Sequence, residues 1–127
     1  MIRINHIGLY VQDLERARAF YEQFFNAVAG EKYRNDRTAF ESYFLDFDGG
    51  PRLELMTRPT VVHRVERPTF GWDHLAISVG SKAEVDRLTE LLNSAGYRTV
   101  SGPRTTGDGY YESVVPDGEG NLIEITA

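Results

Sequence analysis

Cysteine is missing from this chain of 127 residues. Its absence excludes disulfide bonds, thiolate metal sites and cysteine nucleophiles. Any metal ion would have to be held by imidazole, carboxylate, amide or water. The sequence also lacks an apolar run long enough to cross a membrane, and its first residues, MIRINHIGLY, lack the apolar core of a secretion signal. We therefore expect a cytoplasmic protein.

An excess of positive charge is missing as well. Lys and Arg together number 14 and Asp and Glu 19, so the formal net charge is −5. Such a balance disfavours nucleic acid or an anionic membrane as the main partner. The length suits a single domain over residues 1–127, and the 41% of hydrophobic residues are enough to build a core.

Histidine is scarce, yet two of the three histidines occupy matching places. NHIGLYV near the start and DHLAISV at Asp73–Val79 each place a histidine at the head of an apolar, strand-like run. A helical pattern follows each run, in DLERARAFYEQFFNAVAG and in SKAEVDRLTELLNSAG. Repetition of this kind indicates two copies of one structural unit.

The two predicted helices have recognisable ends. Asp13 is the expected N-cap of the first helix, while Ser81 and Glu84 form an expected capping box in the second, which Gly96 terminates. The apolar stripes at helical spacing consist of Leu14, Ala17, Tyr21, Phe24 and Phe25 in the first helix, and of Leu88, Leu91, Leu92 and Ala95 in the second.

Strand patterns complete each copy. FESYFLDF and PRLELMT follow the first helix, YESVVPD and NLIEIT follow the second, and glycine-rich turns separate them. We therefore expect an α+β fold with two βαβββ modules, at residues 1–57 and 72–127. Residues 58–71 would form the linker, and its His63 is expected to be a solvated loop residue without a functional role.

Alternation of side chains along the strands indicates where the histidines point. Successive strand residues face opposite sides of a sheet. When the apolar residues of each run face the helix, the histidine at its head points away from the core. The closing strands, RLELM and LIEIT, direct their central glutamates away from the core in the same manner. His6 and Glu54 in the first half thus match His74 and Glu124 in the second.

Two histidines and two glutamates suit a divalent metal ion. Each residue alone would be read as a structural histidine or a solvated glutamate, but the pattern occurs twice. Partly buried carboxylates repel each other unless a cation neutralises them. Imidazole and carboxylate bind Zn²⁺ at about 2.0–2.2 Å, and the same ligands suit Ni²⁺, Co²⁺, Fe²⁺ or Mn²⁺. Water would complete an open site, where the metal acts as a Lewis acid and a glutamate moves a proton.

Taken together, these motifs resemble the glyoxalase I/bleomycin-resistance/extradiol-dioxygenase group, the vicinal oxygen chelate superfamily. The stretches NHIGLYVQDLERARAFY, GWDHLAISV and GEGNLIEI carry the resemblance, which covers essentially the whole chain. It implies an open eight-stranded barrel around a metal ion, with His6, Glu54, His74 and Glu124 as ligands. It also implies a homodimer, while the short linker leaves open whether the modules pair within one chain or across two.

Within this superfamily, the ligand order His, Glu, His, Glu resembles that of glyoxalase I. Glu54 is the discriminating residue, because dioxygenase-like and fosfomycin-resistance-like members lack a carboxylate there and epimerase-like members carry Gln. The resemblance implies a lactoylglutathione lyase type of reaction. In it, the hemithioacetal of a thiol and a 2-oxoaldehyde such as methylglyoxal becomes a 2-hydroxyacyl thioester, and Glu124 or Glu54 shuttles the proton. The alternatives are an acyl-thioester epimerase, an iron-dependent dioxygenase, or a non-catalytic protein that binds a drug or metabolite.

The sequence indicates the residues that would bind the thiol less clearly than it indicates the metal ligands. Bacterial glyoxalase I enzymes usually carry Arg where this chain has Tyr10, and often Asn where it has Arg58. The thiol, glutathione or another, therefore stays open, as does the choice of metal. The glycine-rich segment Gly102–Gly109 is either a mobile loop over the site or an ordinary hairpin connection. Candidate substrate contacts are Tyr10, Arg52, Arg58, Arg104 and Tyr110.

Overall fold

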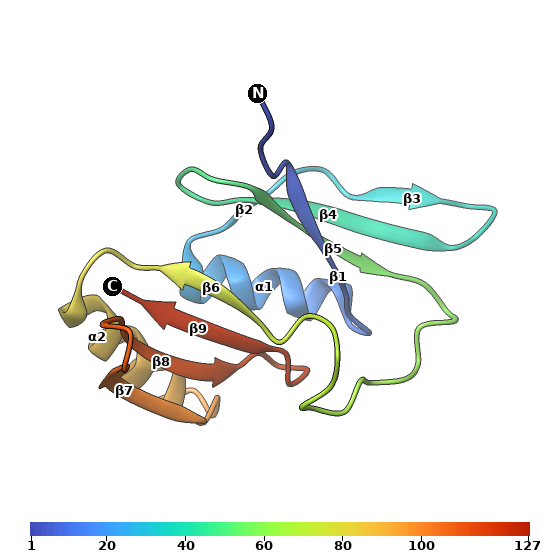
Figure 1. Cartoon of the computed structure of the whole chain (residues 1–127). Coiled ribbons are helices and arrows are strands. Elements are labelled where there is room, and N and C mark those ends of the chain that lie inside the picture. Colours follow the sequence, from blue (N-terminus) through green and yellow to red (C-terminus); the bar gives the residue numbers. More distant parts are fainter. The chain divides into compact units, whose positions relative to one another are not determined.

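The structure, a computed structural model, describes residues 1–127 and divides into two compact units, Met1–Arg64 and Val65–Ala127 (Figure 1). Each unit contains one helix and one mixed sheet, which confirms the predicted α+β fold. The first unit comprises β1 (His6–Tyr10), α1 (Leu14–Phe25), β2 (Val28–Ala29), β3 (Tyr33–Asn35), β4 (Phe40–Asp46) and β5 (Arg52–Thr57). The second comprises β6 (His74–Ser78), α2 (Lys82–Ser94), β7 (Ser101–Thr105), β8 (Tyr111–Pro116) and β9 (Leu122–Thr126). Neither helix has the length and apolar character needed to cross a membrane.

The two sheets repeat one topology. In the first unit the strand order is β1-β5-β4-β2, with β3 also paired to β4, and in the second it is β6-β9-β8-β7. The opening strand of each unit runs parallel to the closing strand, while the other pairs are antiparallel. The first unit departs from the expected βαβββ pattern, because the segment after α1 forms two short strands. The chain leaves the sheet between β2 and β3, where Lys32 reaches Glu15 on α1 and Glu41 on β4.

Helix α1 agrees with the sequence prediction. The side chain of Asp13 accepts a hydrogen bond from the backbone N–H of Arg16 at 3.0 Å, which satisfies a free donor of the first turn. The helix ends at Asn26 in the left-handed conformation, with φ of 53°. Its buried face consists of Leu14, Ala17, Phe20, Tyr21, Phe24 and Phe25.

Helix α2 agrees with the prediction only in part. Ser81 accepts a hydrogen bond from the backbone N–H of Glu84 at 3.2 Å, but the Glu84 carboxylate binds Arg87 at 2.8 Å, so only half of the capping box forms. The predicted apolar stripe is wrong at two positions, because Leu91 and Ala95 are exposed. Thr89 is buried instead, since its hydroxyl donates to the carbonyl oxygen of Val85 and lies 2.7 Å from the hydroxyl of Ser113. The buried face consists of Val85, Leu88, Thr89 and Leu92.

The core of each unit lies between its helix and one face of its sheet. Leu53 and Leu55 of β5 are buried in the first unit, and Ile123 and Ile125 of β9 are buried in the second. Because neighbouring strand residues face opposite sides, Glu54 and Glu124 lie on the faces turned away from the helices. Each of these faces carries one candidate His–Glu pair.

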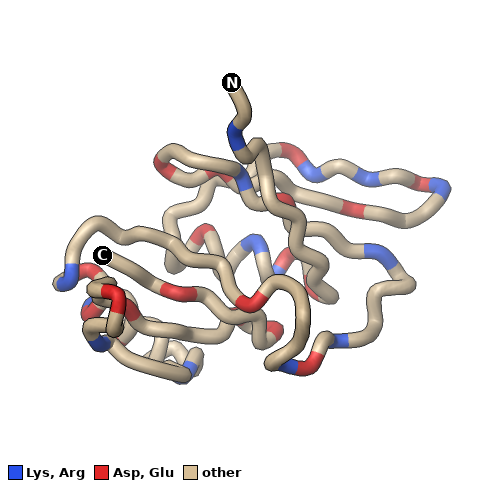
Figure 2. Tube along the Cα trace, in the orientation of Figure 1, with Lys and Arg blue, Asp and Glu red and all other residues tan.

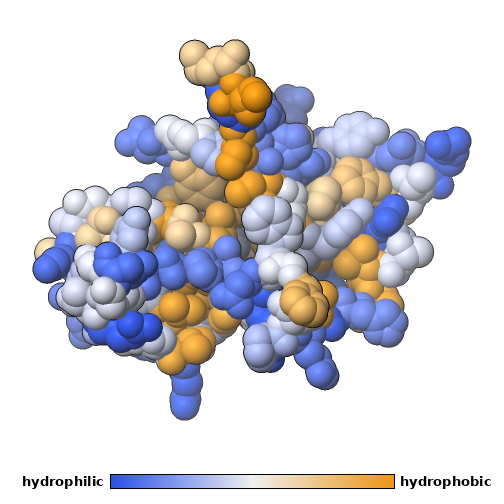
Figure 3. Space-filling view, viewed as in Figure 1, coloured by the Kyte–Doolittle hydropathy of each residue, from blue (hydrophilic) through white to orange (hydrophobic).

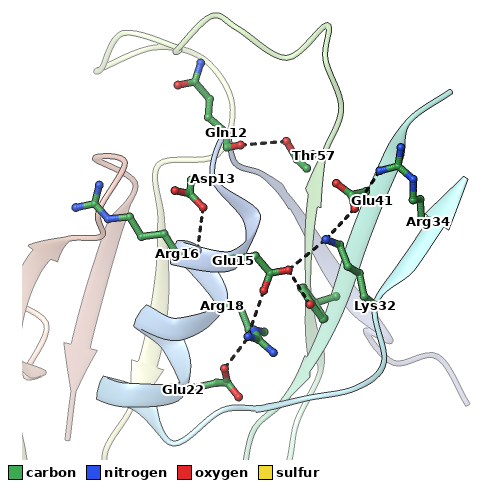
Figure 4. Close-up of polar contacts among 11 residues, drawn as sticks. Gln12, Asp13, Glu15, Arg16, Arg18, Glu22, Lys32, Arg34, Glu41 and Thr57 are labelled. Carbon is green, nitrogen blue, oxygen red and sulfur yellow. Dashed lines mark hydrogen bonds and ion pairs between the residues drawn. The ribbon is translucent and has the colours of Figure 1, made fainter. Parts of the chain in front are cut away.

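A chain of ion pairs braces the helix side of the first unit (Figure 4). The ammonium group of Lys32 lies 3.2 Å from the Glu15 carboxylate and 2.8 Å from that of Glu41. Arg34 on β3 adds a contact of 3.3 Å to Glu41. Basic and acidic positions accordingly stand side by side along the β3–β4 hairpin (Figure 2). The hydroxyl of Tyr43 donates to Glu15 at 2.8 Å, so strand, helix and connecting segment share one network.

We expect Lys32→Met to lower the free energy of unfolding at neutral pH and to have little effect in acid. The hydrogen bond from Tyr43 lowers the pKa of Glu15, and that from Lys32 lowers the pKa of Glu41. Carboxyls with lowered pKa values stabilise the fold above their ordinary pKa of 4.5, and this contribution is lost as the pH falls below it. Urea denaturation of both proteins at neutral and acidic pH measures the difference. A loss of stability that is equal at both pH values would contradict the role assigned to the network.

The segment before β1 is exposed, although it contains the apolar residues Met1, Ile2 and Ile4. Met1 and Ile2 have no contact with the core, and Ile4 is 67% exposed, so the segment forms an orange projection in Figure 3. Where this segment approaches the β4–β5 turn, it lines a cavity of about 600 Å³ together with Arg52. The cavity lies at the end of β1 that carries His6.

Candidate functional site

In the first unit, neighbouring parallel strands bring His6 and Glu54 together. Strand β1 pairs with β5 in a register that sets Gly8 opposite Glu54. The Nε2 atom of His6 lies 3.6 Å from Oε1 of Glu54. The His6 side chain is 40% exposed and that of Glu54 is 17% exposed, so the pair lines a solvent-accessible surface.

The second unit repeats this arrangement with His74 and Glu124. Strand β6 pairs with β9 in the equivalent register, which sets Ala76 opposite Glu124. The Nε2 atom of His74 lies 3.3 Å from Oε2 of Glu124, with side chains 38% and 19% exposed. The four predicted ligands therefore occur as two matching pairs, one in each unit. Neither unit alone gathers three His, Asp or Glu side chains around one point.

The Nε2–carboxylate distances suit two atoms that bind one metal ion. Ligand atoms about 2.1 Å from a metal and about 90–110° apart are separated by about 3.0–3.4 Å. The distance in the second unit falls within this range, and that in the first is slightly longer. Imidazole nitrogen and carboxylate oxygen are also the donors that first-row divalent ions accept. The residues present thus fit a divalent metal ion.

The other ring nitrogen of each histidine is held by the residue directly before it. The Nδ1 atom of His6 lies 2.8 Å from Oδ1 of Asn5, and that of His74 lies 2.8 Å from Oδ2 of Asp73. Neither Asn5 nor Asp73 was predicted to have a role, although both are visible in the motifs NHIGLYV and DHLAISV. These contacts direct both Nε2 atoms toward the glutamates.

Glu112 on β8 is a further acidic residue of the site that the sequence analysis missed. It lies beside Glu124 on the face turned away from α2, since Ser113 and Val115 occupy the buried face. The hydrogen bond with Glu124 raises the pKa of Glu112 from its ordinary value of 4.5 to about 7, with added contributions from burial and from the charges of Glu124 and Asp108. Alternation along YESVVPD was the signal that could have found it.

We expect the metal-free protein to lose stability as the pH rises from about 4.5 through about 7. A carboxyl whose pKa is raised in the folded state contributes stability below its ordinary pKa, and this contribution disappears as the pH passes the raised value of about 7. Glu112→Gln should flatten this dependence and make the protein more stable than wild type at alkaline pH. Urea unfolding in the presence of a chelator measures both effects. Identical pH profiles for the two proteins would show that the Glu112–Glu124 pair does not cause the loss.

The predicted substrate contacts of the first unit differ in their surroundings. Arg52 donates a hydrogen bond to Oδ1 of Asn5 at 3.3 Å and lies 4.3 Å above the ring of Phe44, which packs edge-on against His6. Arg52 thus contacts two neighbours of His6, and it also lines the cavity of about 600 Å³. The guanidinium of Arg58 lies 5.5 Å from the centre of the Tyr10 ring, and Arg58 lines a cavity of about 480 Å³. Of the two arginines, Arg58 has the freer guanidinium.

The predicted contacts of the second unit lie on or beside the β7–β8 hairpin. The Nε atom of Arg104 donates to the hydroxyl of Ser101 at 3.2 Å, and Tyr110 is 57% exposed in the turn. Thr106 closes the turn, because its backbone N–H donates to the carbonyl oxygen of Tyr110 at 2.7 Å. Gly102 has φ of 78°, and a Cβ atom there would lie 2.5 Å from the carbonyl oxygen of Glu112. The segment thus begins within β7 and forms the turn to β8, and Gly102 is required by its conformation and packing.

Gly8 and Met56 make a close approach next to Glu54. A Cβ atom at Gly8 would lie 2.9 Å from the terminal methyl of Met56. Met56 follows Glu54 by two residues and shares its face of β5, while Tyr10 lies opposite Met56 on β1. The surface beside the first His–Glu pair is therefore filled by a thioether and an aromatic ring.

Comparison with known proteins places the chain in a family. The profile of the Glyoxalase/Bleomycin resistance protein/Dioxygenase superfamily matches residues 3–125. An uncharacterized protein of Bacillus subtilis (strain 168), YqjT, is 28% identical over 131 aligned positions that cover 98% of both chains.

Solved structures share the fold at low identity. The trypanothione-dependent glyoxalase I of Leishmania major is 21% identical with a TM-score of 0.80, covering 99% of this chain and 86% of its own. The fosfomycin resistance protein FosX of Listeria monocytogenes, in complex with Mn(II) and sulfate ion, is 24% identical with a TM-score of 0.74, covering 100% of this chain and 93% of its own. The family profile spans nearly the whole sequence, and we conclude that this chain belongs to the Glyoxalase/Bleomycin resistance protein/Dioxygenase superfamily.

Proposed function

We propose that this protein is a glyoxalase I-like, metal-dependent lyase. It would convert the hemithioacetal of a thiol and a 2-oxoaldehyde into a 2-hydroxyacyl thioester. The observation that carries the proposal is the His–Glu pair that recurs in both units, with Nε2–carboxylate distances of 3.6 and 3.3 Å. Membership of the superfamily and the fold shared with a glyoxalase I support it.

The proposed metal ligands are His6, Glu54, His74 and Glu124. A bound divalent ion, Ni²⁺, Zn²⁺ or Co²⁺ with Mn²⁺ or Fe²⁺ as further candidates, would supply Lewis acidity to the two neighbouring oxygens of the substrate. The binding of Mn(II) by FosX supports a divalent ion as cofactor. Glu54 favours the glyoxalase reaction within the superfamily, since it adds a second carboxylate to the ligand set.

Glu124 is the proposed base, with Glu54 as the second candidate. A carboxylate near the substrate takes the proton from the carbon that bears sulfur and returns it to the neighbouring carbon. The new C–H bond replaces the one that was broken, so the reaction needs neither oxidant nor reductant. We assign substrate recognition to Tyr10, Arg52 and Arg58 in the first unit, and to Arg104 and Tyr110 of the β7–β8 hairpin in the second. Arg58 is the best placed of them to bind a carboxylate of the thiol, because its guanidinium stacks on Tyr10.

Reconstitution of the metal-stripped protein tests the proposal. Turnover of methylglyoxal hemithioacetals is measured with Ni²⁺, Co²⁺ or Zn²⁺, and glutathione is compared with other low-molecular-weight thiols. Thioester formation that depends on added metal is the expected result, and it identifies the thiol. Tight metal binding without product from any thiol would overturn the glyoxalase activity in favour of another reaction of the superfamily. The proposal includes a cytoplasmic homodimer, and light scattering of the purified protein measures its mass.

A further inference from the structure

The Nδ1 atoms of His6 and His74, which face away from the glutamates, each contact the side chain of the preceding residue. Oxygen atoms of Asn5 and Asp73 each lie 2.8 Å from the Nδ1 atom of the following histidine. A carboxylate oxygen accepts hydrogen bonds and cannot donate one. Nδ1 of His74 is therefore the donor of this hydrogen bond, and Nε2 lies 3.3 Å from the Glu124 carboxylate, in position to bind a metal ion shared with it.

The Asn5 contact leads to the same protonation state of His6. An amide side chain can present either its oxygen or its NH₂ group, and neighbouring donors decide between them. Arg52 donates to Oδ1 of Asn5 at 3.3 Å, which holds the oxygen toward both Arg52 and His6. Nδ1 of His6 is then the donor. A free histidine side chain in water favours the opposite tautomer, with the proton on Nε2.

We propose that Asn5 and Asp73 are positioning residues that fix both histidines in the Nδ1–H tautomer. We also propose that the two His–Glu pairs contribute unequally to metal binding, and that the His74–Glu124 pair contributes more. The inference rests on the proposed metal function. A carboxylate that accepts a hydrogen bond from a ligand histidine increases the basicity of the imidazole. Asp73 supplies such a carboxylate to His74, whereas Asn5 supplies only a neutral amide to His6.

The charges around the two His–Glu pairs also favour stronger metal binding at His74 and Glu124. In the strand register, Arg52 lies opposite His6, whereas Leu122 lies opposite His74. Because Arg52 is also held close to His6 through Asn5 and Phe44, its positive charge opposes a cation at the first pair. No such charge lies at the equivalent position of the second unit. The charge of Asp73 and the absence of an arginine both favour the second pair.

Nitrogen NMR of the metal-free protein at alkaline pH, where imidazole is neutral, tests the tautomers directly. We expect Nδ1 of His6 and His74 to have the chemical shift of a protonated nitrogen. His63 serves as an internal reference, because it follows Val62 and has no such neighbour. Asp73→Ala should return His74 to the Nε2–H form and leave His6 unchanged. An Nε2–H form of either His6 or His74 in wild type would overturn the assignment.

Metal affinity, measured by competition with a chelator for Ni²⁺ and Zn²⁺, tests the ranking. Asp73→Ala should weaken binding by about 10–100-fold, and Asp73→Asn by less, since it keeps the hydrogen bond without the charge. Asn5→Ala should cost less than Asp73→Ala, and Asn5→Asp should tighten binding. A larger loss in Asn5→Ala than in Asp73→Ala would overturn the ranking. If the wild type binds neither ion, the proposed metal function and the ranking fail together, and the NMR result alone decides the positioning role.

Discussion

Glu124→Gln is expected to lower turnover by about 10²–10⁴-fold, the usual contribution of a positioned general base. Glutamine has the size of glutamate and can still contact the neighbouring His74, but its amide cannot accept the substrate proton. The Glu124 side chain lies on the sheet face away from the buried Ile123 and Ile125, so the substitution leaves the core unchanged. The rate of thioester formation at saturating metal and substrate measures the effect.

The matched control is Glu54→Gln, which makes the same change at the equivalent position of the first unit. We expect this variant to bind metal more weakly and to keep a larger share of its turnover when metal is saturating. The metal content of each variant must be measured beside its rate, because both residues are proposed ligands. Equal losses of turnover in the two metal-loaded variants would show that Glu124 is not the only base in the proton transfer. Full activity of Glu124→Gln would refute its role as base.

Leu92→Ala is expected to lower the free energy of unfolding by about 2–5 kcal/mol, the range for a truncated core leucine. Leu92 is 0% exposed on the face of α2 that packs on the second sheet. Leu91→Ala, one residue earlier, should change the stability by no more than about 0.5 kcal/mol, because Leu91 is 45% exposed. Urea denaturation at a single pH compares the two variants. Equal losses would mean that the helix packs in a different rotation about its axis.

The sequence pattern predicts most of the fold because hydrophobic periodicity decides it. The stripe of α1 is wide and aromatic, and each of its predicted positions is buried. The apolar stripe of α2 is narrower. The sequence alone does not show whether a leucine lies at the exposed edge of this stripe or at its buried centre, because that depends on how the sheet packs against the helix. Thr89 is buried because Ser113 on β8 meets its hydroxyl, a contact between residues far apart in the sequence. The break between β2 and β3 includes Lys32, whose partners Glu15 and Glu41 lie on other elements and could not be predicted from the sequence.

The candidate ligands could be predicted because strand alternation and internal repetition are both visible in the sequence. Glu112, Asn5 and Asp73 were also accessible to such reasoning, one through alternation and two through their place before a histidine. The side-chain contacts of Arg52 were not accessible. Its guanidinium lies between Asn5 and the ring of Phe44, an arrangement set by side-chain conformations, and its role as a substrate contact stays a prediction.

The close approach of Gly8 and Met56 has a consequence for the divergence of this protein. The methyl group of Met56 occupies the space that a side chain at Gly8 would need. Because the methyl group is the far end of a flexible side chain, a small side chain at position 8 can be accommodated by a change in the Met56 rotamer alone. Single substitutions at position 8 can therefore move the Met56 thioether and reshape the surface beside Glu54, a candidate ligand, without a change in the ligand itself.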